Sequence, residues 1–206
     1  MATELVAQAA VSAATAGLVL ALLRRAGPRS GGLAAAVPVT SMPALYWLAA
    51  ERGGSYAAAA AAGSLWGTFA SAAMAWLGAV LLLRRASAWP PPHPLDERAR
   101  AVLSMGAAGG MSLVVGLLAR HAGPALCGLV AAVPVVALTT TFVAHRRGGA
   151  ATAGLFLRGY LDGMFAKSVF LGTLGAAWML GAGAAAWPLA LAGAALTLAA
   201  QQRRLA

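Results

Sequence analysis

The stretch Ala26-Gly-Pro-Arg-Ser-Gly-Gly-Leu-Ala-Ala-Ala-Val-Pro-Val39 decides the fold, because the chain contains it twice. The second copy reads Ala122-Gly-Pro-Ala-Leu-Cys-Gly-Leu-Val-Ala-Ala-Val-Pro-Val135, and ten of the fourteen aligned positions are identical. Each copy begins with a turn, continues as an apolar segment and carries an internal proline, Pro38 or Pro134. Proline lacks the backbone N–H of other residues, so each copy predicts a kinked apolar helix.

The composition around these repeats is that of a membrane protein. Of 206 residues, 61% are hydrophobic and only 10% are charged, whereas soluble domains average about 25% charged residues. The net charge is +10, but the arginines lie between apolar runs rather than along one helix face, which argues against nucleic-acid binding. The single cysteine, Cys127, lies in an apolar run and is expected to be a buried hydrophobic residue, with no disulfide.

Seven apolar segments are each long enough to cross roughly 30 Å of hydrocarbon as a helix. The third is long, and we expect it to be tilted or broken near Gly63 or Gly67. The seven segments cover about residues 4–23, 31–50, 55–83, 101–119, 125–144, 150–174 and 177–200.

The arginines indicate how these segments cross the membrane. With seven spans, eleven arginines fall on one side, and only Arg52 and Arg120 fall on the other. The positive-inside rule then places the N-terminus outside and the C-terminus in the cytoplasm. Residues 51–54 and 120–123 are predicted to be extracytoplasmic, and residues 85–100 cytoplasmic. The expected location is the cytoplasmic (inner) membrane of a bacterium.

The repeat extends beyond its opening stretch. Gly53-Gly54 corresponds to Gly148-Gly149, and Gly63, Leu65, Gly67, Phe69 and Ala70 correspond to residues 96 positions later. A repeat of three spans contains an odd number, so its second copy must enter the membrane upside down. The predicted fold class is an all-α polytopic membrane protein with seven transmembrane helices, arranged as two inverted three-helix repeats plus one C-terminal helix.

This fold divides the chain into four parts. The first repeat covers residues 1–85, a proline-rich cytoplasmic linker covers 86–98, and the second repeat covers 99–175. Residues 176–206 form the seventh helix and a basic C-terminal tail. The linker contains Trp89-Pro-Pro-Pro-His-Pro-Leu-Asp96, which is typical of an extended spacer with polyproline character.

The segment Gly31-Gly-Leu-Ala-Ala-Ala-Val-Pro-Val-Thr-Ser-Met-Pro-Ala-Leu-Tyr-Trp-Leu48 resembles the second helix of the GlpM-like proteins, which are small bacterial inner-membrane proteins of roughly half this length. The match covers the first three helices well and the others more loosely, as if two such units were fused. Val136-Ala137 departs from it where the first copy has Thr40-Ser41. The resemblance implies a fold rather than an activity. The layout is also similar to that of TRIC-type cation channels, by architecture alone.

Ionisable residues inside a membrane span are costly and commonly functional. The sixth segment contains Arg158 and Asp162, which are four residues apart and therefore share a helix face. Counting from Gly149 at 1.5 Å per residue places Asp162 about 20 Å along the helix, near the middle of the membrane. We expect Asp162 to face the interior and to pair with Arg158, either as a lock between helices or as part of a solute or proton pathway. Lys167 lies about 140° further round the helix.

Polar residues near the prolines complete the candidate pathway. Their hydroxyl groups can bond carbonyls that the prolines free, or they can line a polar path. The predicted substrate or ion pathway comprises Asp162, Arg158, Lys167, Thr40, Ser41, Thr139 and Thr140, and the predicted kinks are Pro38 and Pro134.

The sequence contains no constellation typical of an enzyme, and His93, His121 and His145 have spacings unlike a zinc site. We expect no enzymatic activity and no cofactor. The first hypothesis is a small transporter that moves a solute or ion through a site between inverted repeats, with proton coupling as an option. The alternatives are a non-catalytic subunit of an envelope-biosynthesis or export assembly, and a TRIC-like cation channel. The expected partners are membrane lipids, a small-molecule or ion substrate and, as an option, further copies of the chain.

Overall fold

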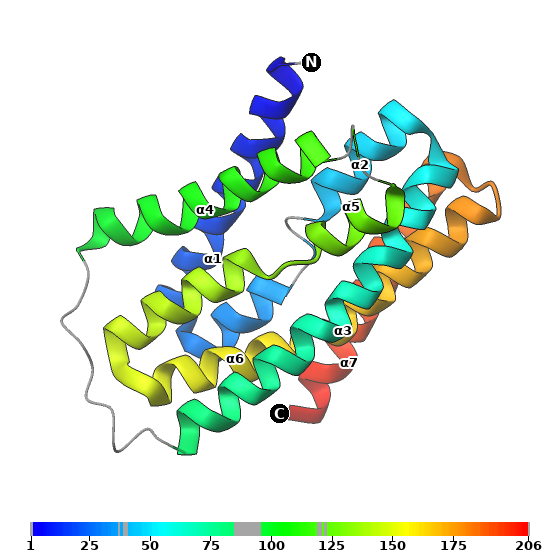
Figure 1. The fold of residues 1–206 in the computed structure, drawn as a ribbon. Helices are drawn as coiled ribbons and strands as arrows, with labels where there is room; N and C mark the ends of the chain where they lie inside the picture. The colour runs from blue at the N-terminus through cyan, green and yellow to red at the C-terminus, as the bar shows by residue number, and fades with distance from the viewer. Residues whose placement is uncertain are drawn as a thin grey trace.

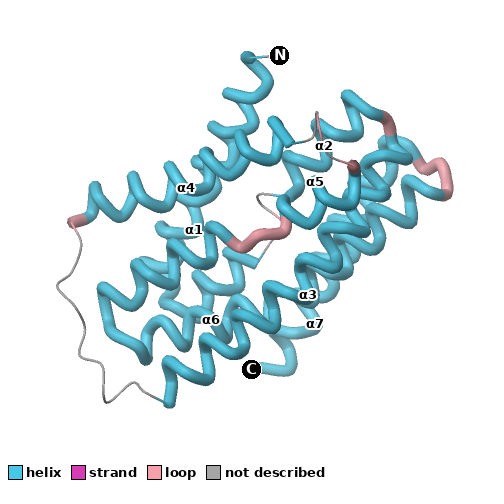
Figure 2. The backbone as a smooth tube through the Cα atoms, viewed as in Figure 1, coloured by secondary structure: helices cyan, strands magenta, loops and turns pink. Residues whose placement is uncertain are grey.

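The computed structural model of the chain describes residues 2–36, 38, 41–84, 96–118, 121 and 123–205. Across these residues the regular structure is helical, with one short 3-10 turn and no strand (Figures 1 and 2). This confirms the predicted all-α class. Most of the predicted linker, residues 86–95, lies outside the described residues, and the following helix begins within the predicted linker at Glu97.

The first half of the chain contains α1 (Ala2–Ala36), α2 (Ser41–Arg52) and α3 (Gly54–Arg84). α1 consists of two helical pieces, because Gly27 has a φ of 85° and a ψ of 174° between them. A positive φ of this size is readily adopted only by glycine. The chain therefore turns sharply before Pro28, and the piece from Pro28 to Ala36 forms a separate short helix. α3 is one continuous helix, so of the two predicted alternatives, a tilt or a break near Gly63 or Gly67, the break is not present.

The second half contains α4 (Glu97–Leu118), α5 (Pro124–Ala131) and α6 (Val135–Met179). α6 is also divided, because Gly148 and Gly149 have non-helical backbone angles and Gly149 has a φ of 74°. The chain reverses direction at these glycines, as Figure 1 shows for the yellow-green and yellow parts of α6. A 3-10 turn (Gly183–Ala185) and α7 (Ala186–Leu205) complete the chain.

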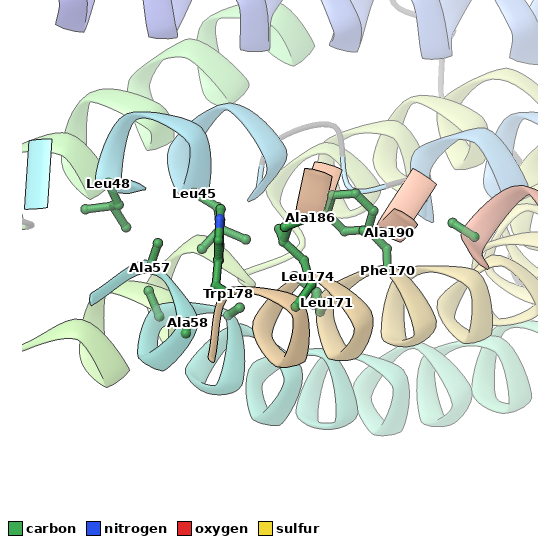
Figure 3. Packing of buried hydrophobic residues seen from close by; sticks show 14 of the residues in the cluster. Leu45, Leu48, Ala57, Ala58, Phe170, Leu171, Leu174, Trp178, Ala186 and Ala190 are labelled. Carbon is green, nitrogen blue, oxygen red and sulfur yellow. The ribbon is translucent and has the colours of Figure 1, made fainter. Parts of the chain in front are cut away.

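The largest buried cluster lies where α2, α3, α6 and α7 meet. Figure 3 shows Leu45 of α2 next to Trp178 of α6, Leu48 of α2 near Ala57 of α3, and Phe170 of α6 by Ala190 of α7. Phe170 and Leu174 are fully buried. The small alanine side chains let the helix backbones approach closely. The second part of α6 is therefore the central helix of the fold, in contact with α1, α3 and α7.

Three segments of the described chain are long and apolar enough to cross a membrane. They are Gly54–Leu82, Pro124–Met179 and Gly183–Gln201. Large apolar side chains on their surfaces are exposed, among them Trp66, Phe69 and Phe165. An outward-facing apolar surface around a small-residue core suits lipid contact. The structure thus supports a membrane protein with transmembrane helices.

Candidate functional site

The helical path is interrupted at both copies of the repeated proline. α1 and α2 lie on either side of Pro38, which is buried, and α5 and α6 lie on either side of Pro134. The carbonyl oxygens of Pro38 and Pro134 accept bonds from Met42 N (2.7 Å) and Leu138 N (2.8 Å), respectively. Each proline therefore begins the helix that follows it, although its missing N–H prevents the preceding helix from continuing. A helix that ends inside a fold needs other donors for its last carbonyl oxygens.

The short helix before the second break packs tightly against α3. A Cβ atom at Gly63 would collide with the backbone carbonyl of Ala125, and one at Gly67 would lie 2.5 Å from the Cβ of Ala132. From the other side, a Cβ at Gly128 would collide with the backbone of α3. Only glycine fits at these three positions without a backbone shift. The first piece of the second broken helix thus lies against the long helix of the first half.

The short helix before the first break makes the corresponding contacts with α6. A Cβ at Gly159 would collide with the backbone carbonyl of Arg29, and one at Gly163 would lie 2.5 Å from the Cβ of Ala36. A Cβ at Gly32 would collide with the backbone of α6. Every one of these positions is 96 residues from its counterpart at the α3–α5 contact. Each long helix therefore holds the first piece of the other half's broken helix.

Two buried serines of α3 donate hydrogen bonds to carbonyl oxygens of α5 and of the residue that follows it. Ser64 Oγ donates to the carbonyl oxygen of Gly128 at 2.9 Å, and Ser71 Oγ donates to that of Ala132 at 3.1 Å. The last carbonyls of a helix have no intrahelical donor. Ser71 thus provides a hydrogen bond at the site where the helix stops.

α6 has different residues at the corresponding places. Tyr160 stands where α3 has Ser64, and Lys167 stands where α3 has Ser71. Lys167 is 5% exposed and has no hydrogen-bond or ion-pair partner among the described residues. Tyr160 is 2% exposed and lies seven residues earlier, on the same face of the helix. The contact between α3 and α5 therefore contains neutral, hydrogen-bonded serines. The equivalent position on α6, beside the short helix of α1, has the buried amine of Lys167 instead.

The hydroxyl groups near the breaks fall into two groups. Ser41 and Thr140 are both fully buried, and their hydroxyl oxygens have no hydrogen-bond partner in the part of the chain that the structure describes. Thr139 Oγ1, in contrast, donates to the carbonyl oxygen of Val135 at 2.9 Å, within its own helix. Thr40 lies outside the described residues. Ser41 and Thr140 are therefore the hydroxyl groups left to bind something else.

The predicted pair of Arg158 and Asp162 is replaced by a different pair. Asp162 Oδ2 accepts bonds from Arg29 Nη2 at 3.0 Å and from Arg29 Nε at 3.3 Å. Arg158 is exposed and forms no ion pair with the described residues. The side chains of Arg29 and Asp162 are 53% and 35% exposed, so this ion pair is not interior. It ties the short helix of α1 to α6 at the edge of the fold.

The depth of Asp162 also differs from the sequence-based expectation. Its backbone carbonyl accepts a bond from Gln201 Nε2 at 2.8 Å. Gln201 is the last residue of the apolar segment Gly183–Gln201, just before Arg203 and Arg204. Asp162 therefore lies level with the basic end of that segment rather than with its middle. Lys167, five residues further along α6, is the charged group deep in the helix contact.

A cavity of about 190 Å³ lies beside the second break. Its wall is mainly apolar and comes from α3 and both parts of α6, with Ser71, Pro134 and Tyr160 among the lining residues. It therefore adjoins both the break at Pro134 and Tyr160 of α6, whereas Lys167 is not among its lining residues. A small solute could occupy such a space, because ligand sites in proteins are mostly apolar cavities with a few polar groups.

The sequence prediction missed Arg29, Ser64, Ser71 and Tyr160. In the sequence Arg29 lies between two apolar segments, and the two serines carry no signal as isolated residues. The repeat gives a signal for the two serines and Tyr160, because the counterpart of Lys167 is Ser71 and the counterpart of Tyr160 is Ser64, but it gives none for Arg29, whose counterpart is Ala125.

No family model matches the chain, and no curated protein or solved structure matches it significantly. Among the described residues, no group of three or more histidine, cysteine or acidic side chains could hold a metal ion.

Proposed function

We propose that this chain is a small membrane transporter that moves a solute or ion through a site between two inverted halves. In this proposal the chain crosses the membrane seven times. The two breaks interrupt the second and fifth spans, and the turns at Gly27 and at Gly148-Gly149 are the ends of hairpins. The N-terminus is outside, the C-terminus is in the cytoplasm, and the membrane is the bacterial inner membrane.

The inverted arrangement is supported by the reciprocal packing of the halves. α3 holds the short helix of the second half and α6 holds that of the first, through glycines at equivalent positions. In known transporters, inverted repeats place interrupted helices near the membrane midplane, where their exposed backbone groups bind the substrate. The breaks at Pro38 and Pro134 give this chain two such places.

The observation that carries the proposal is the buried amine of Lys167. A lysine deep in membrane helices costs about 2.5–3.5 kcal/mol on insertion scales, so a chain that retains one without a partner has a use for it. Its repeat counterpart, Ser71, shows that a neutral residue suffices for packing at an equivalent contact. We assign Lys167 the role of binding an anionic solute or of exchanging a proton during transport, with Ser41, Thr140 and Tyr160 as neutral polar groups near the path.

The role assigned to Lys167 also distinguishes an anion carrier from a cation channel. An unpaired lysine repels cations, so the geometry favours a carrier for an anion over a cation channel. Asp162 has its own partner near the edge of the fold and becomes a structural contact between α1, α6 and α7.

The test is flux into proteoliposomes that contain the full chain. Potassium chloride, phosphate and acetate are offered in turn, and internal pH and membrane potential are followed by fluorescent dyes. We expect saturable flux of at least one anion, which Lys167→Met abolishes and the exposed control Arg158→Gln retains. Potassium flux that does not saturate and survives Lys167→Met would indicate a channel. No flux of any probe in the wild type would favour the non-transporting subunit.

A further inference from the structure

The cavity beside the second break lies at a place that the repeat treats differently in the two halves. Ala75 and Gly78 of α3 line it together with Ala137 of α6, and these small residues leave its volume of about 190 Å³ open. The counterparts of Ala75 and Gly78 on α6, 96 residues later, are Leu171 and Leu174. Both leucines are buried in the packed cluster of Figure 3, with exposed fractions of 1% and 0%. The packing of a long helix therefore does not require small residues at these two positions.

Three residues that line the cavity carry hydroxyl groups, and two of these groups are already bound. Ser71 Oγ donates to the carbonyl oxygen of Ala132 at 3.1 Å, and Thr141 Oγ1 donates to that of Ala137 at 2.6 Å. Tyr160 is 2% exposed, and its hydroxyl group forms no hydrogen bond within the part of the chain that the structure describes. A buried hydroxyl group without a partner is costly. The hydroxyl group of Tyr160 is therefore available to a ligand in the cavity.

The rest of the cavity wall sets the charge and polarity of that ligand. The wall is almost entirely apolar, and none of the described residues that line it is charged. A charged molecule that entered from water would lose its hydration without gaining a counter-charge. An oxygen atom on a neutral molecule, in contrast, can accept a hydrogen bond from Tyr160. The ligand that fits this wall is therefore neutral and mainly apolar, with one acceptor.

The volume and position of the cavity set the size of the ligand and its route of entry. An apolar protein cavity of roughly 150 Å³ takes a benzene ring, so a cavity of about 190 Å³ takes a ring with one small substituent. Met74 and Leu138 also line the cavity, and these residues are 56% and 55% exposed. They belong to the apolar surface that suits lipid contact. A neutral molecule dissolved in the membrane can therefore enter without crossing water.

We infer that the cavity beside Pro134 binds a small, neutral, mainly apolar molecule whose single oxygen acceptor is bonded by the hydroxyl group of Tyr160. This site goes beyond the proposed transport of an anion, because Lys167 is not among the residues that line it. Its occupancy is measured in the purified protein and needs no flux. A bound molecule contacts α3 and both parts of α6, and so holds the second break in one arrangement.

Carbon-13 NMR of the full chain in detergent, labelled at its methionine methyl groups, tests this inference. The signal of Met74, which lines the cavity, reports binding and is assigned with Met74→Leu. Three probes are titrated separately. Acetophenone is neutral and carries one carbonyl oxygen, α-methylstyrene has the same shape with a CH₂ group in place of that oxygen, and benzoate is the charged analogue.

Three variants accompany the wild type in these titrations. Tyr160→Phe removes only the available hydroxyl group. Thr141→Val is the matched control, because it removes a hydroxyl group that is already bound within its own helix. Ala75→Leu introduces the residue that α6 has at the equivalent position, and so fills the cavity. Partition of a probe into the detergent is the same for all variants, so the ratio of its affinities between variants reports on the cavity.

We expect acetophenone to shift the Met74 signal saturably. Its affinity should fall about fivefold in Tyr160→Phe, the effect of one hydrogen bond, and should be unchanged in Thr141→Val. Binding should be lost in Ala75→Leu. The affinity of α-methylstyrene should be the same in the wild type and in Tyr160→Phe, and benzoate should leave the Met74 signal unshifted.

Equal affinity of acetophenone for the wild type and Tyr160→Phe would overturn the inference, as would the absence of a saturable shift. If Tyr160→Phe is poorly folded, acetophenone and α-methylstyrene are compared on the wild type after correction for their partition into the detergent, and equal affinities again overturn it. Tighter binding of benzoate than of acetophenone would assign the cavity to the anion pathway instead. Each of these results can be read whether or not the chain transports an anion.

Discussion

The two long helices α3 and α6 perform the same packing task with different chemistry. Each holds a short helix of the opposite half through two glycines one turn apart. On α3, Ser64 and Ser71 donate hydrogen bonds to that short helix and to its end. On α6, the same two positions are Tyr160 and Lys167, and the lysine is buried without a partner. The glycines, which both helices share, are what the packing requires. Lys167, which only α6 has, is not needed for that packing.

The largest expected effect concerns the glycines that both helices share. Gly159→Ala should lower the free energy of unfolding by about 3 kcal/mol, because the new Cβ meets the backbone of Arg29 and the short helix must move away. Gly172→Ala on the same helix is the matched control, since a Cβ there has nothing within 4 Å, and it should stabilise by about 0.5–1 kcal/mol.

Chemical unfolding in detergent measures both variants. Gly63→Ala should cost about as much as Gly159→Ala, because the packing is reciprocal. A large cost at one of these positions and none at the other would show that the two contacts are not equivalent.

Lys167→Met should change stability in the opposite direction. Removal of an unpartnered buried amine should raise the free energy of unfolding by about 2 kcal/mol, because the desolvation cost of the ammonium disappears. Flux should be lost in the same variant, as expected of a residue kept for function at the expense of stability. A destabilised Lys167→Met protein would instead mean that the amine has a structural partner, and the proposed role of Lys167 would be withdrawn.

Ser71→Ala provides the counterpart on α3. The loss of its bond to the carbonyl oxygen of Ala132 should lower the free energy of unfolding by about 1 kcal/mol, the typical net value of a buried hydrogen bond. Flux should persist, because the hydroxyl group of Ser71 is already bound to this carbonyl oxygen, although the residue also lines the cavity beside Pro134. Ser71→Ala and Lys167→Met should therefore change stability in opposite directions. If Ser71→Ala stabilised the protein, the serine on α3 would not have the structural role that we assign to it.

Asp162→Asn should have the smallest effect. Its ion pair with Arg29 is about half exposed, so solvent screens it and its loss should cost about 0.5 kcal/mol. Arg29→Gln should cost a similar amount, and the double variant should show little further loss because both changes remove one interaction. Thermal unfolding of the three variants measures this. A loss above about 2 kcal/mol would indicate an interior pair and would return Asp162 to the centre of the site.

The sequence identified the helical segments well, because long uncharged apolar runs and a repeated proline are local signals. It could not identify the partner of Asp162, because Arg29 reaches it only through the packing of a short helix from the other half. The sequence also predicts the wrong depth for Asp162, which lies level with the basic end of α7. The count started at Gly149, although the second part of α6 continues to Met179 and is longer than the roughly 20 residues that a membrane requires.

The special position of Lys167 was equally hidden from the sequence. A helical projection placed it away from Asp162, but could not show that it faces the other half of the protein. That information lies in the glycine contacts, which orient α6 against the short helix of α1. Of the predicted pathway residues, the structure buries Lys167, Ser41 and Thr140, and it leaves Arg158 and Asp162 nearer the surface.

The most direct test of the account is the sidedness of two equivalent residues. Arg52 and Arg147 occupy the same place in the two halves, directly before the double glycines, and both are exposed. In a chain carrying Cys127→Ala, we would place a single cysteine at either position and label intact cells with a reagent that cannot cross the membrane. Inverted halves predict labelling of Arg52→Cys from outside and of Arg147→Cys only after the membrane is permeabilised. Labelling of both cysteines from the same side would contradict the inverted repeat, and the proposed transport site between the halves would fall with it.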